Sequence, residues 1–264
     1  MIVDFHTHVY DRPDYVSMLA ETAHNLGFSK LCIGGGEPRY GLAANETVLA
    51  ESESYPELFI PFAFLRPGRD GPAEVEGFFR DGFQGLKIGA PSAPCDSPEL
   101  LPLFQSAEAL DMPVLFHTRI PPATSLDRGI NIKSDFARPI HLDGLARQLP
   151  GLKIIGTGLG SPWFEEAAAL LGVHNNVFFD LSGVQLMDRG AQFFKLILGA
   201  ESDSKWEEPS QRSRWTQIVF GTASENKDIP FVERDYQRLF RALALPDGLV
   251  DHVMGNNAVR LLGK

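Results

Sequence analysis

Three histidines lie where predicted strands end, and their types and spacing suit metal binding. His6 and His8 fall in the apolar run Ile2–Val9, and alternate side chains of a strand point to the same face, so their imidazoles converge. His117 closes a second apolar run, Pro113–Thr118, in the same position relative to its strand. Catalytic zinc commonly takes three protein ligands and leaves one position for water. The three histidines therefore form a candidate metal site.

Each of these histidines also has a plainer interpretation. The pair could belong to an exposed loop, but the apolar run before it favours a buried strand. His117 alone would most often be a structural residue satisfied by a hydrogen bond, and only the pair makes it a third ligand. The remaining histidines fall in predicted helices or loops and have no metal-binding spacing; they are His24, His141, His174 and His252.

Lys87 lies within the predicted strand Gly85–Gly89, which must be almost wholly buried. A buried ammonium group is costly without a partner, so this side chain should face the same open end as the histidines. There it could bind a substrate carboxylate, lower the pKa of a bound water molecule, or bridge metal ions as a carbamate. A salt bridge to a neighbouring strand is the alternative.

Two arginines follow strand ends and could act with this lysine. Arg66 follows the predicted strand Leu58–Leu65, and Arg119 should project on the same side as His117. Together with Lys87 they could clamp an anionic group, because guanidinium groups bind carboxylates through paired hydrogen bonds. Alternatively, each arginine pairs with a surface acid at the rim.

Asp180 is the carboxylate placed at a strand end in the latter half of the chain, in the run Val177–Ser182. A carboxylate in that position could move a proton during catalysis. The alternative is a capping or loop-bonding role. Asp180 and Lys87 are therefore both candidate catalytic residues.

Eight short apolar, β-branched or aromatic runs, bounded by Gly, Pro or polar residues, are predicted strands. They are Ile2–Val9, Lys30–Gly34, Leu58–Leu65, Gly85–Gly89, Pro113–Thr118, Lys153–Gly158, Val177–Ser182 and Ile218–Ala223. Segments long enough for a helix separate the runs, and this alternation implies parallel strands. The sequence therefore predicts an α/β protein of the (β/α)8 (TIM) barrel type, whose active site lies at the carboxyl ends of the strands.

Helical patterns fill several of the intervening segments. They include Tyr15–Leu26, Pro98–Leu110, Leu142–Leu149, Trp163–Leu171 and a terminal helical pair over Phe231–Leu262 that Pro246 and Gly248 interrupt. The longest connection runs from Arg119 to about His141, and a connection of that length in a barrel is more often an active-site loop than a flaw.

Composition limits the class of partner. The 264 residues fit one barrel domain over 1–264, and a net charge of −10 without a Lys/Arg cluster argues against nucleic acid and favours a small molecule. No signal-like N-terminus or run of about 18 apolar residues occurs, so we expect a cytoplasmic protein with no membrane partner. Cys32 and Cys95 give neither a disulfide framework nor a metal-binding spacing. A homo-oligomeric state is left open.

Six segments, in this order and spacing, resemble the amidohydrolase-2 family of the amidohydrolase superfamily over nearly the whole chain. They are Val-Asp-Phe-His-Thr-His, Pro-Val-Leu-Phe-His-Thr, Pro-Gly-Leu-Lys-Ile-Ile, Pro-Trp-Phe-Glu-Glu-Ala, Asn-Val-Phe-Phe-Asp-Leu-Ser-Gly and Gly-Asn-Asn-Ala-Val-Arg-Leu-Leu. The resemblance implies a (β/α)8 barrel that binds one divalent metal, often zinc, and hydrolyses or decarboxylates small carboxylic or aromatic acids. It also implies that His6, His8 and His117 are metal ligands.

Two residues of the family pattern are missing. Gly158 stands where the family usually has a histidine at the end of strand six, and Ala223 stands where the strand-eight aspartate should bind metal and shuttle a proton. Glu225, two residues beyond Ala223, would point the same way if the strand continues, and is a candidate replacement. We expect the metal, with zinc as the first choice, to bind more weakly than in the family.

Two functions follow from these observations. The first is a metal-dependent hydrolase, or a non-oxidative decarboxylase, that acts on a small anionic substrate held by Arg66, Lys87 and Arg119. The second is a barrel that has lost turnover and binds a small acid. The missing aspartate favours the second function and the three histidines favour the first, which we adopt as the prediction.

Overall fold

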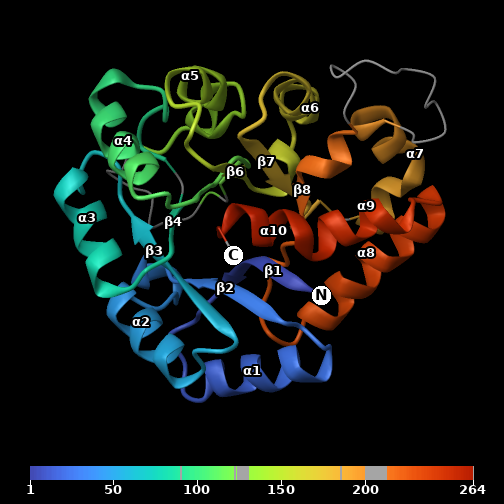
Figure 1. Cartoon of the computed structure of the whole chain (residues 1–264), viewed down its shortest axis with the longest axis horizontal. Coiled ribbons are helices and arrows are strands. Elements are labelled where there is room, and N and C mark those ends of the chain that lie inside the picture. Colours follow the sequence, from blue (N-terminus) through green and yellow to red (C-terminus); the bar gives the residue numbers. More distant parts are fainter. Residues whose placement is uncertain (90, 122, 124–130, 185, 200–212, 264) are drawn as a thin grey trace.

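The protein folds into a closed ring of parallel strands surrounded by helices (Figure 1), as a computed structural model describes for residues 1–89, 91–121, 123, 131–184, 186–199 and 213–263. The eight strands pair in sequence order and are parallel throughout. They are β1 Val3–His8, β2 Lys30–Gly34, β3 Phe59–Leu65, β4 Gly85–Ile88, β5 Val114–Phe116, β6 Ile154–Gly156, β7 Val177–Asp180 and β8 Ile218–Val219. The predicted (β/α)8 barrel is confirmed.

The last strand returns to the first and closes the ring. Phe5 N donates to Phe220 O at 2.9 Å, and Ala223 N donates to His6 O at 2.7 Å. The predicted run Ile218–Ala223 is therefore longer than β8, but its backbone still reaches β1 past the strand end. Closure satisfies the polar edges that an open sheet would leave.

Asp4 reinforces this closure from inside the protein. It is fully buried, and its Oδ1 accepts hydrogen bonds from the backbone N of His6 (3.0 Å) and of Thr222 (3.1 Å). Its Oδ2 accepts from Thr222 Oγ1 at 2.6 Å. One carboxylate thus joins the beginning of β1 to the segment that follows β8.

Two layers of apolar side chains form the core. Alternate strand residues point into the barrel, where Phe5 and Phe62 pack edge to face with ring centroids 5.4 Å apart, and the others pack outward against the helices. The C-terminal residues Ala258 and Leu261 join the inner cluster, and their helix contacts β1 and β8. In Figure 1 this helix crosses the end of the barrel. Because it covers one end, the cavity is left to the other.

The predicted helices are present with shifts of a few residues at their ends. The helices are α1 Tyr15–Asn25, α2 Asn45–Ser54, α3 Pro72–Asp81, α4 Leu101–Ala109, α5 His141–Gln148, α6 Phe164–Val173, α7 Leu186–Leu198, α8 Ile229–Leu243, α9 Asp247–Asp251 and α10 Asn257–Leu261. The expected interruption occurs between α8 and α9, where Pro246 precedes α9, whereas Gly248 lies within α9. A π-helical turn, His252–Asn256, then leads into α10, so the predicted terminal pair consists of three helices and this turn. Among the described residues no helix is both long and apolar enough to cross a membrane.

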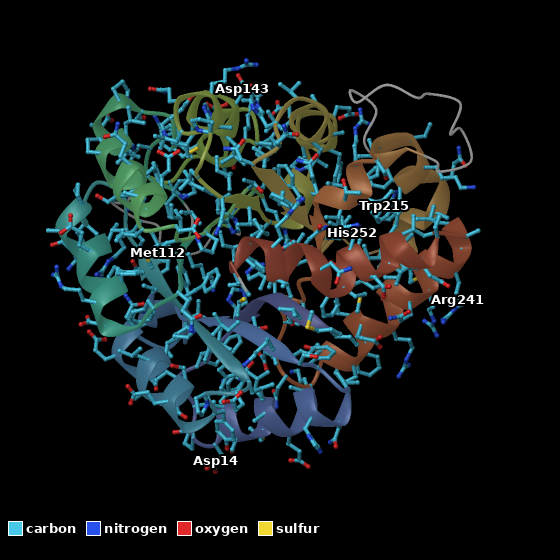
Figure 2. The ribbon with its side chains drawn as sticks, viewed as in Figure 1. Asp14, Met112, Asp143, Trp215, Arg241 and His252 are labelled. Atoms are coloured by element: carbon cyan, nitrogen blue, oxygen red, sulfur yellow. The ribbon has the colours of Figure 1, made fainter. Side chains whose placement is uncertain are left out.

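Charged side chains project from the outer ring of helices, where Figure 2 places Asp14 and Arg241 at the periphery. Trp215 is 1% exposed and lies inside the ring beside the C-terminal helices. The acidic charge of the chain is therefore carried mainly by a surface in contact with water, where salt screens it within about 10 Å.

Asp4→Ala should lower the free energy of unfolding by about 3 kcal/mol, because it leaves three buried donors without an acceptor. The matched control is Asp81→Ala, since Asp81 is exposed at the end of α3, and its expected change is about 0.5 kcal/mol or less. Urea unfolding followed by circular dichroism measures both. Equal changes in the two variants would show that the closure does not depend on Asp4.

Candidate active site

The carboxyl ends of the strands enclose a cavity of about 570 Å³. Six of the residues singled out from the sequence line it together: His6, His8, Arg66, Lys87, His117 and Arg119. Pro121 and Ile132, from the two ends of the long connection after β5, line it as well, which supports the prediction of an active-site loop. The middle of that loop, residues 122 and 124–130, lies outside the described residues.

His6 is held by a buried carboxylate. Its Nδ1 lies 2.8 Å from Asp180 Oδ2, and Asp180 Oδ1 accepts from the backbone N of Gly158 (2.7 Å) and of Ser182 (2.9 Å). Burial alone would raise the pKa of Asp180, but His6 and these donors keep it below its usual value. Asp180 is fully buried and does not line the cavity. It therefore acts through His6, whose Nδ1 it occupies and whose Nε2 it leaves for a ligand.

Lys87 and His8 contact each other at the base of the cavity. Lys87 Nζ lies 2.5 Å from His8 Nδ1 and also donates to Gly35 O at 3.0 Å and to Gly34 O at 3.4 Å. Burial lowers the pKa of Lys87 to about 7, and burial followed by the charge of Lys87 lowers the pKa of His8 well below its usual value. No carboxylate within the described residues pairs with Lys87, so the expected alternative of a salt bridge is absent there.

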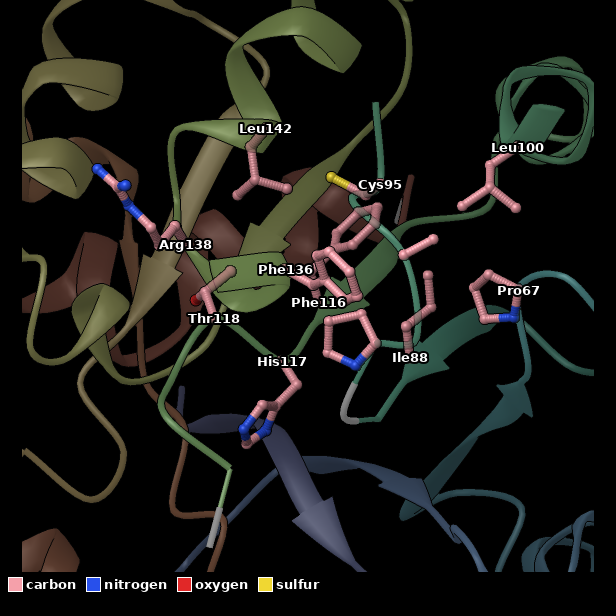
Figure 3. A pocket seen from close by; sticks show the side chains of 12 residues that line it. Pro67, Ile88, Cys95, Leu100, Phe116, His117, Thr118, Phe136, Arg138 and Leu142 are labelled. Carbon is pink, nitrogen blue, oxygen red and sulfur yellow. The ribbon is translucent and has the colours of Figure 1, made fainter. Parts of the chain in front are cut away.

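His117 faces the large cavity and a second, smaller one of about 20 Å³, where Phe116, Phe136 and Leu142 are among the lining residues. Figure 3 shows its ring turned away from Phe136 and Leu142. Burial, and next the charge of Arg119, lower the pKa of His117 to about 4. Its Nε2 is buried and has no hydrogen-bond partner in the part of the chain that the structure describes. His117 is therefore neutral at neutral pH and has an unsatisfied nitrogen.

The predicted arginines are both at the cavity, in different positions. Arg66 lines the cavity, and its Nε donates to Asp70 Oδ2 at 3.3 Å. Arg66 therefore pairs with an acid as the alternative expected, but the Asp70 side chain is 7% exposed and is not a surface acid. Arg119 also lines the cavity, and its Nη2 donates to Gly183 O at 3.5 Å. The sequence interpretation missed Arg69, which lines the rim three residues after Arg66. The sequence could have indicated Arg69, because it is a second arginine in the same loop after β3 as Arg66.

Glu225 does not take the place of the missing strand-eight carboxylate. It pairs with Arg12, with Oε2 3.0 Å from Nη1 and Oε1 3.2 Å from Nη2, and it is not part of the cavity lining. The chain turns at Ala223, whose φ of 48° ends the strand alternation on which the prediction relied. Ala223 itself lines the cavity but carries no donor atom. This arrangement gives no support to a proton-transfer role for Glu225.

The donors at the cavity do not fit a divalent metal ion. The described residues include no group of three His, Cys, Asp or Glu side chains close enough to hold one. His8 Nδ1 faces Lys87, and Asp180 is saturated by His6 and two backbone N–H groups. The donors that remain are imidazole nitrogens, among them His6 Nε2 and the unsatisfied His117 Nε2, and no carboxylate of the described residues lies beside them at the cavity. A catalytic zinc site needs three converging ligands, commonly with a carboxylate to offset its charge. Here Lys87 and Arg119 already supply positive charge.

The family model described as Amidohydrolase, that of the amidohydrolase-2 family, matches residues 35–264, and the chain belongs to this family. The resemblance noted in the sequence is thereby confirmed, although β1 with His6 and His8 precedes the matched range. No protein of the curated set matches the chain.

Solved structures of similar fold cover nearly the whole chain. An uncharacterized TIM-barrel protein of Bordetella bronchiseptica is 18% identical, with a TM-score of 0.71 and coverage of 99% of this chain and 98% of that one. A probable 2-pyrone-4,6-dicarboxylic acid hydrolase of Acinetobacter baumannii with bound citric acid is 15% identical, with a TM-score of 0.64 and coverage of 100% and 99%.

A third similar structure contains a metal ion. It is a 5-carboxyvanillate decarboxylase of Novosphingobium aromaticivorans complexed with manganese and 4-hydroxy-3-methoxy-5-nitrobenzoic acid. It is 14% identical to this chain, with a TM-score of 0.65 and coverage of 100% of this chain and 96% of that one. At these identities the three structures establish the fold that the chain shares with them.

The pKa of Lys87 gives the cavity a pH-dependent charge. Because that pKa is about 7, the ammonium form is present below it and is lost as the pH rises through it. The affinity for a fully ionised carboxylate should therefore fall about tenfold between roughly pH 6 and pH 9. Isothermal titration calorimetry measures this change, and Lys87→Met should remove it. A slope that persists in Lys87→Met would assign the titration to another group.

Proposed function

We propose that this protein is a hydrolase or decarboxylase of a small organic acid, which it holds by the carboxylate at the base of the cavity. The observation that carries the proposal is the meeting of Lys87 and Arg119 with the His6–Asp180 pair around one cavity. The first two residues supply positive charge and the pair supplies a neutral base. The names of the similar structures include both a hydrolase and a decarboxylase of carboxylic acids.

Charge supports an anionic substrate. Arg66, Arg69, Lys87 and Arg119 line the cavity, and Glu37 is its one acidic lining residue among those described. The net charge of −10 belongs to the whole chain and lies mainly on solvent-facing surfaces. Because an ammonium group loses hydration on burial, Lys87 has most to gain from a ligand carboxylate.

His6 is suited to act as the general base. Burial, opposed by Asp180, lowers the pKa of His6, so the ring is neutral at neutral pH. With a hydrogen on Nδ1 donated to Asp180, its Nε2 accepts a proton, the arrangement in which a buried aspartate orients a histidine base. In hydrolysis, a water molecule would give a proton to Nε2 while its oxygen bonds to the acyl carbon, and that proton would then pass to the leaving group.

In decarboxylation the requirement is different. The carboxylate leaves as carbon dioxide, and the carbon that carried it takes up a proton. Lys87, a candidate catalytic residue from the sequence, is in its ammonium form the cavity group that could supply this proton. Both reactions place the substrate carboxylate or its charge beside Lys87 and Arg119.

A zinc-dependent route would use the His6, His8 and His117 set that the sequence predicted. It would require His8 to part from Lys87 and the site to gain a carboxylate, so the proposal assigns the reaction to side chains of the protein. Glu225 has no part in it because it pairs with Arg12.

A second function is a barrel that binds a small acid without turnover. Ala223 favours it, because this residue leaves the cavity without the carboxylate expected on strand eight. The two functions share the binding step and differ in whether His6 has a bond to act on. Measuring turnover of a bound acid separates them.

The binding step is tested with matched pairs of ligands. Calorimetry with benzoate and benzamide, and with other small aromatic acids and their amides, should show that acids bind and amides bind weakly. Lys87→Met keeps the length of the side chain and removes its charge, so affinity should fall about tenfold to a hundredfold for the acid and little for the amide. Equal losses of affinity for both ligands, or no loss for either, would mean that Lys87 has only a structural role in the barrel and does not bind the carboxylate.

The catalytic step is tested at Asp180. For any acid or acid derivative that is turned over, Asp180→Asn should lower kcat by about 10²–10⁴ with a small change in KM, because His6 loses the partner that fixes its tautomer. Glu225→Gln tests the alternative drawn from the sequence. An equal fall of kcat in Glu225→Gln would mean that proton transfer passes through Glu225 instead.

A further inference from the structure

Arg119 occupies the space that a side chain at position 158 would need. A Cβ on Gly158 would lie 2.3 Å from Arg119 Cδ and 2.9 Å from Arg119 Cγ, both far inside van der Waals contact. Gly158 follows β6, at the position where the family pattern has a histidine. The side chain of Arg119 comes from the end of β5 and crosses over this glycine. An arginine from one strand therefore fills the place of the expected residue on the next.

A second glycine, Gly183, leaves room for the guanidinium of Arg119. A Cβ on Gly183 would lie 2.2 Å from Arg119 Nη1 and 2.6 Å from Cζ, and the carbonyl of Gly183 accepts from Nη2. Gly158 and Gly183 both have a positive φ, of 61° and 62°. We call these two residues the glycine cradle. The cradle receives the stem of Arg119 at Gly158 and its guanidinium at Gly183. The charge of Arg119 lowers the pKa values of His6, His8 and His117.

Lys87 occupies a second position that a metal site would need. Its Nζ contacts His8 Nδ1 and two backbone carbonyls, which are acceptors that suit a cation. A divalent ion bound through this nitrogen of His8 would have to displace the ammonium group. Arg119 and the ammonium form of Lys87 together put positive charge where the family pattern calls for a metal and its ligands.

We propose that the glycine cradle makes Arg119, with Lys87, the resident cation of the site, so that the protein binds its acid without a metal ion. This inference rests on the proposed function in that the ligand is a carboxylate. With its stem over Gly158 and its guanidinium over Gly183, Arg119 presents donors to the carboxylate, while the ammonium form of Lys87 neutralises the carboxylate from the base of the cavity. Geometric fit of Arg119, rather than metal loading, then decides affinity.

The metal is tested without any acid. Zinc affinity is measured by competition with a chromogenic chelator, and metal content by elemental analysis after treatment with 1,10-phenanthroline, which carries no carboxylate. We expect wild-type protein to hold substoichiometric zinc, and benzoate affinity in calorimetry to be unchanged within about twofold by added Zn²⁺ or Mn²⁺. Stoichiometric zinc that resists the chelator, or benzoate binding that requires a metal, overturns the inference.

The cradle is tested with three matched glycine variants. Gly158→Ala and Gly183→Ala push against Arg119, whereas Gly27→Ala places a methyl in open space at a similar φ of 68°. All three should lose thermal stability from the positive φ, and Gly158→Ala and Gly183→Ala should lose more, since a Cβ on Gly158 would also lie 2.9 Å from Ser182 O. Only these two should lose about tenfold or more of their benzoate affinity. Gly27 lies between α1 and β2, at the opposite end of the barrel from the cavity.

Arg119→Met covers the case in which a cradle variant does not fold. It should lose as much benzoate affinity as Gly158→Ala and keep benzamide affinity, and combining the two changes should add little, since both remove the same contact. Unchanged benzoate affinity in Arg119→Met or in folded Gly158→Ala overturns the inference. If wild-type protein binds none of the acids, the proposed function fails instead, and the zinc measurement still decides whether the site holds a metal.

Discussion

The burial of Lys87 without a carboxylate partner among the described residues is the feature on which the site depends. A buried ammonium group loses its hydration, and backbone carbonyls with one imidazole recover only part of that loss. Its pKa falls to about 7 for this reason. An incoming carboxylate would recover part of what burial removed, which is the physical basis of the proposed affinity for acids. The neutral histidines follow from the same cause, since desolvation and neighbouring positive charge lower their pKa values together.

The barrel supports this site by leaving one end open and fixing the other. C-terminal residues of α10 pack against the inner cluster, and Asp4 joins β1 to the segment after β8. This rigidity matters because the His6–Asp180 pair spans two strands far apart in the sequence. Positions at strand ends can then differ from those of similar barrels, as Gly158 and Ala223 do, without a change in the scaffold.

Among similar structures, the same architecture is associated with manganese in a decarboxylase and with citric acid in a hydrolase. This chain shares their fold and belongs to the amidohydrolase-2 family, but it lacks the histidine and the aspartate that the family pattern places at the ends of strands six and eight. Two donors of the family pattern are replaced by residues without donor atoms, and the vacated volume at Gly158 is taken by a cation. At this position a guanidinium-bearing side chain therefore lies where the family pattern has a ligand.

The sequence by itself determined the barrel and most of the cavity lining. Period-two apolar runs and the alternation of strand and helix are local signals, and the carboxyl ends of parallel strands must meet, so His6, His8, Lys87, His117 and Arg119 could be placed together. Only the tertiary structure decided what each side chain contacts. Asp180 binds His6, Glu225 turns out to Arg12, and Arg119 lies over Gly158. These contacts join residues up to 213 positions apart and depend on backbone turns such as that at Ala223, which no local pattern specifies.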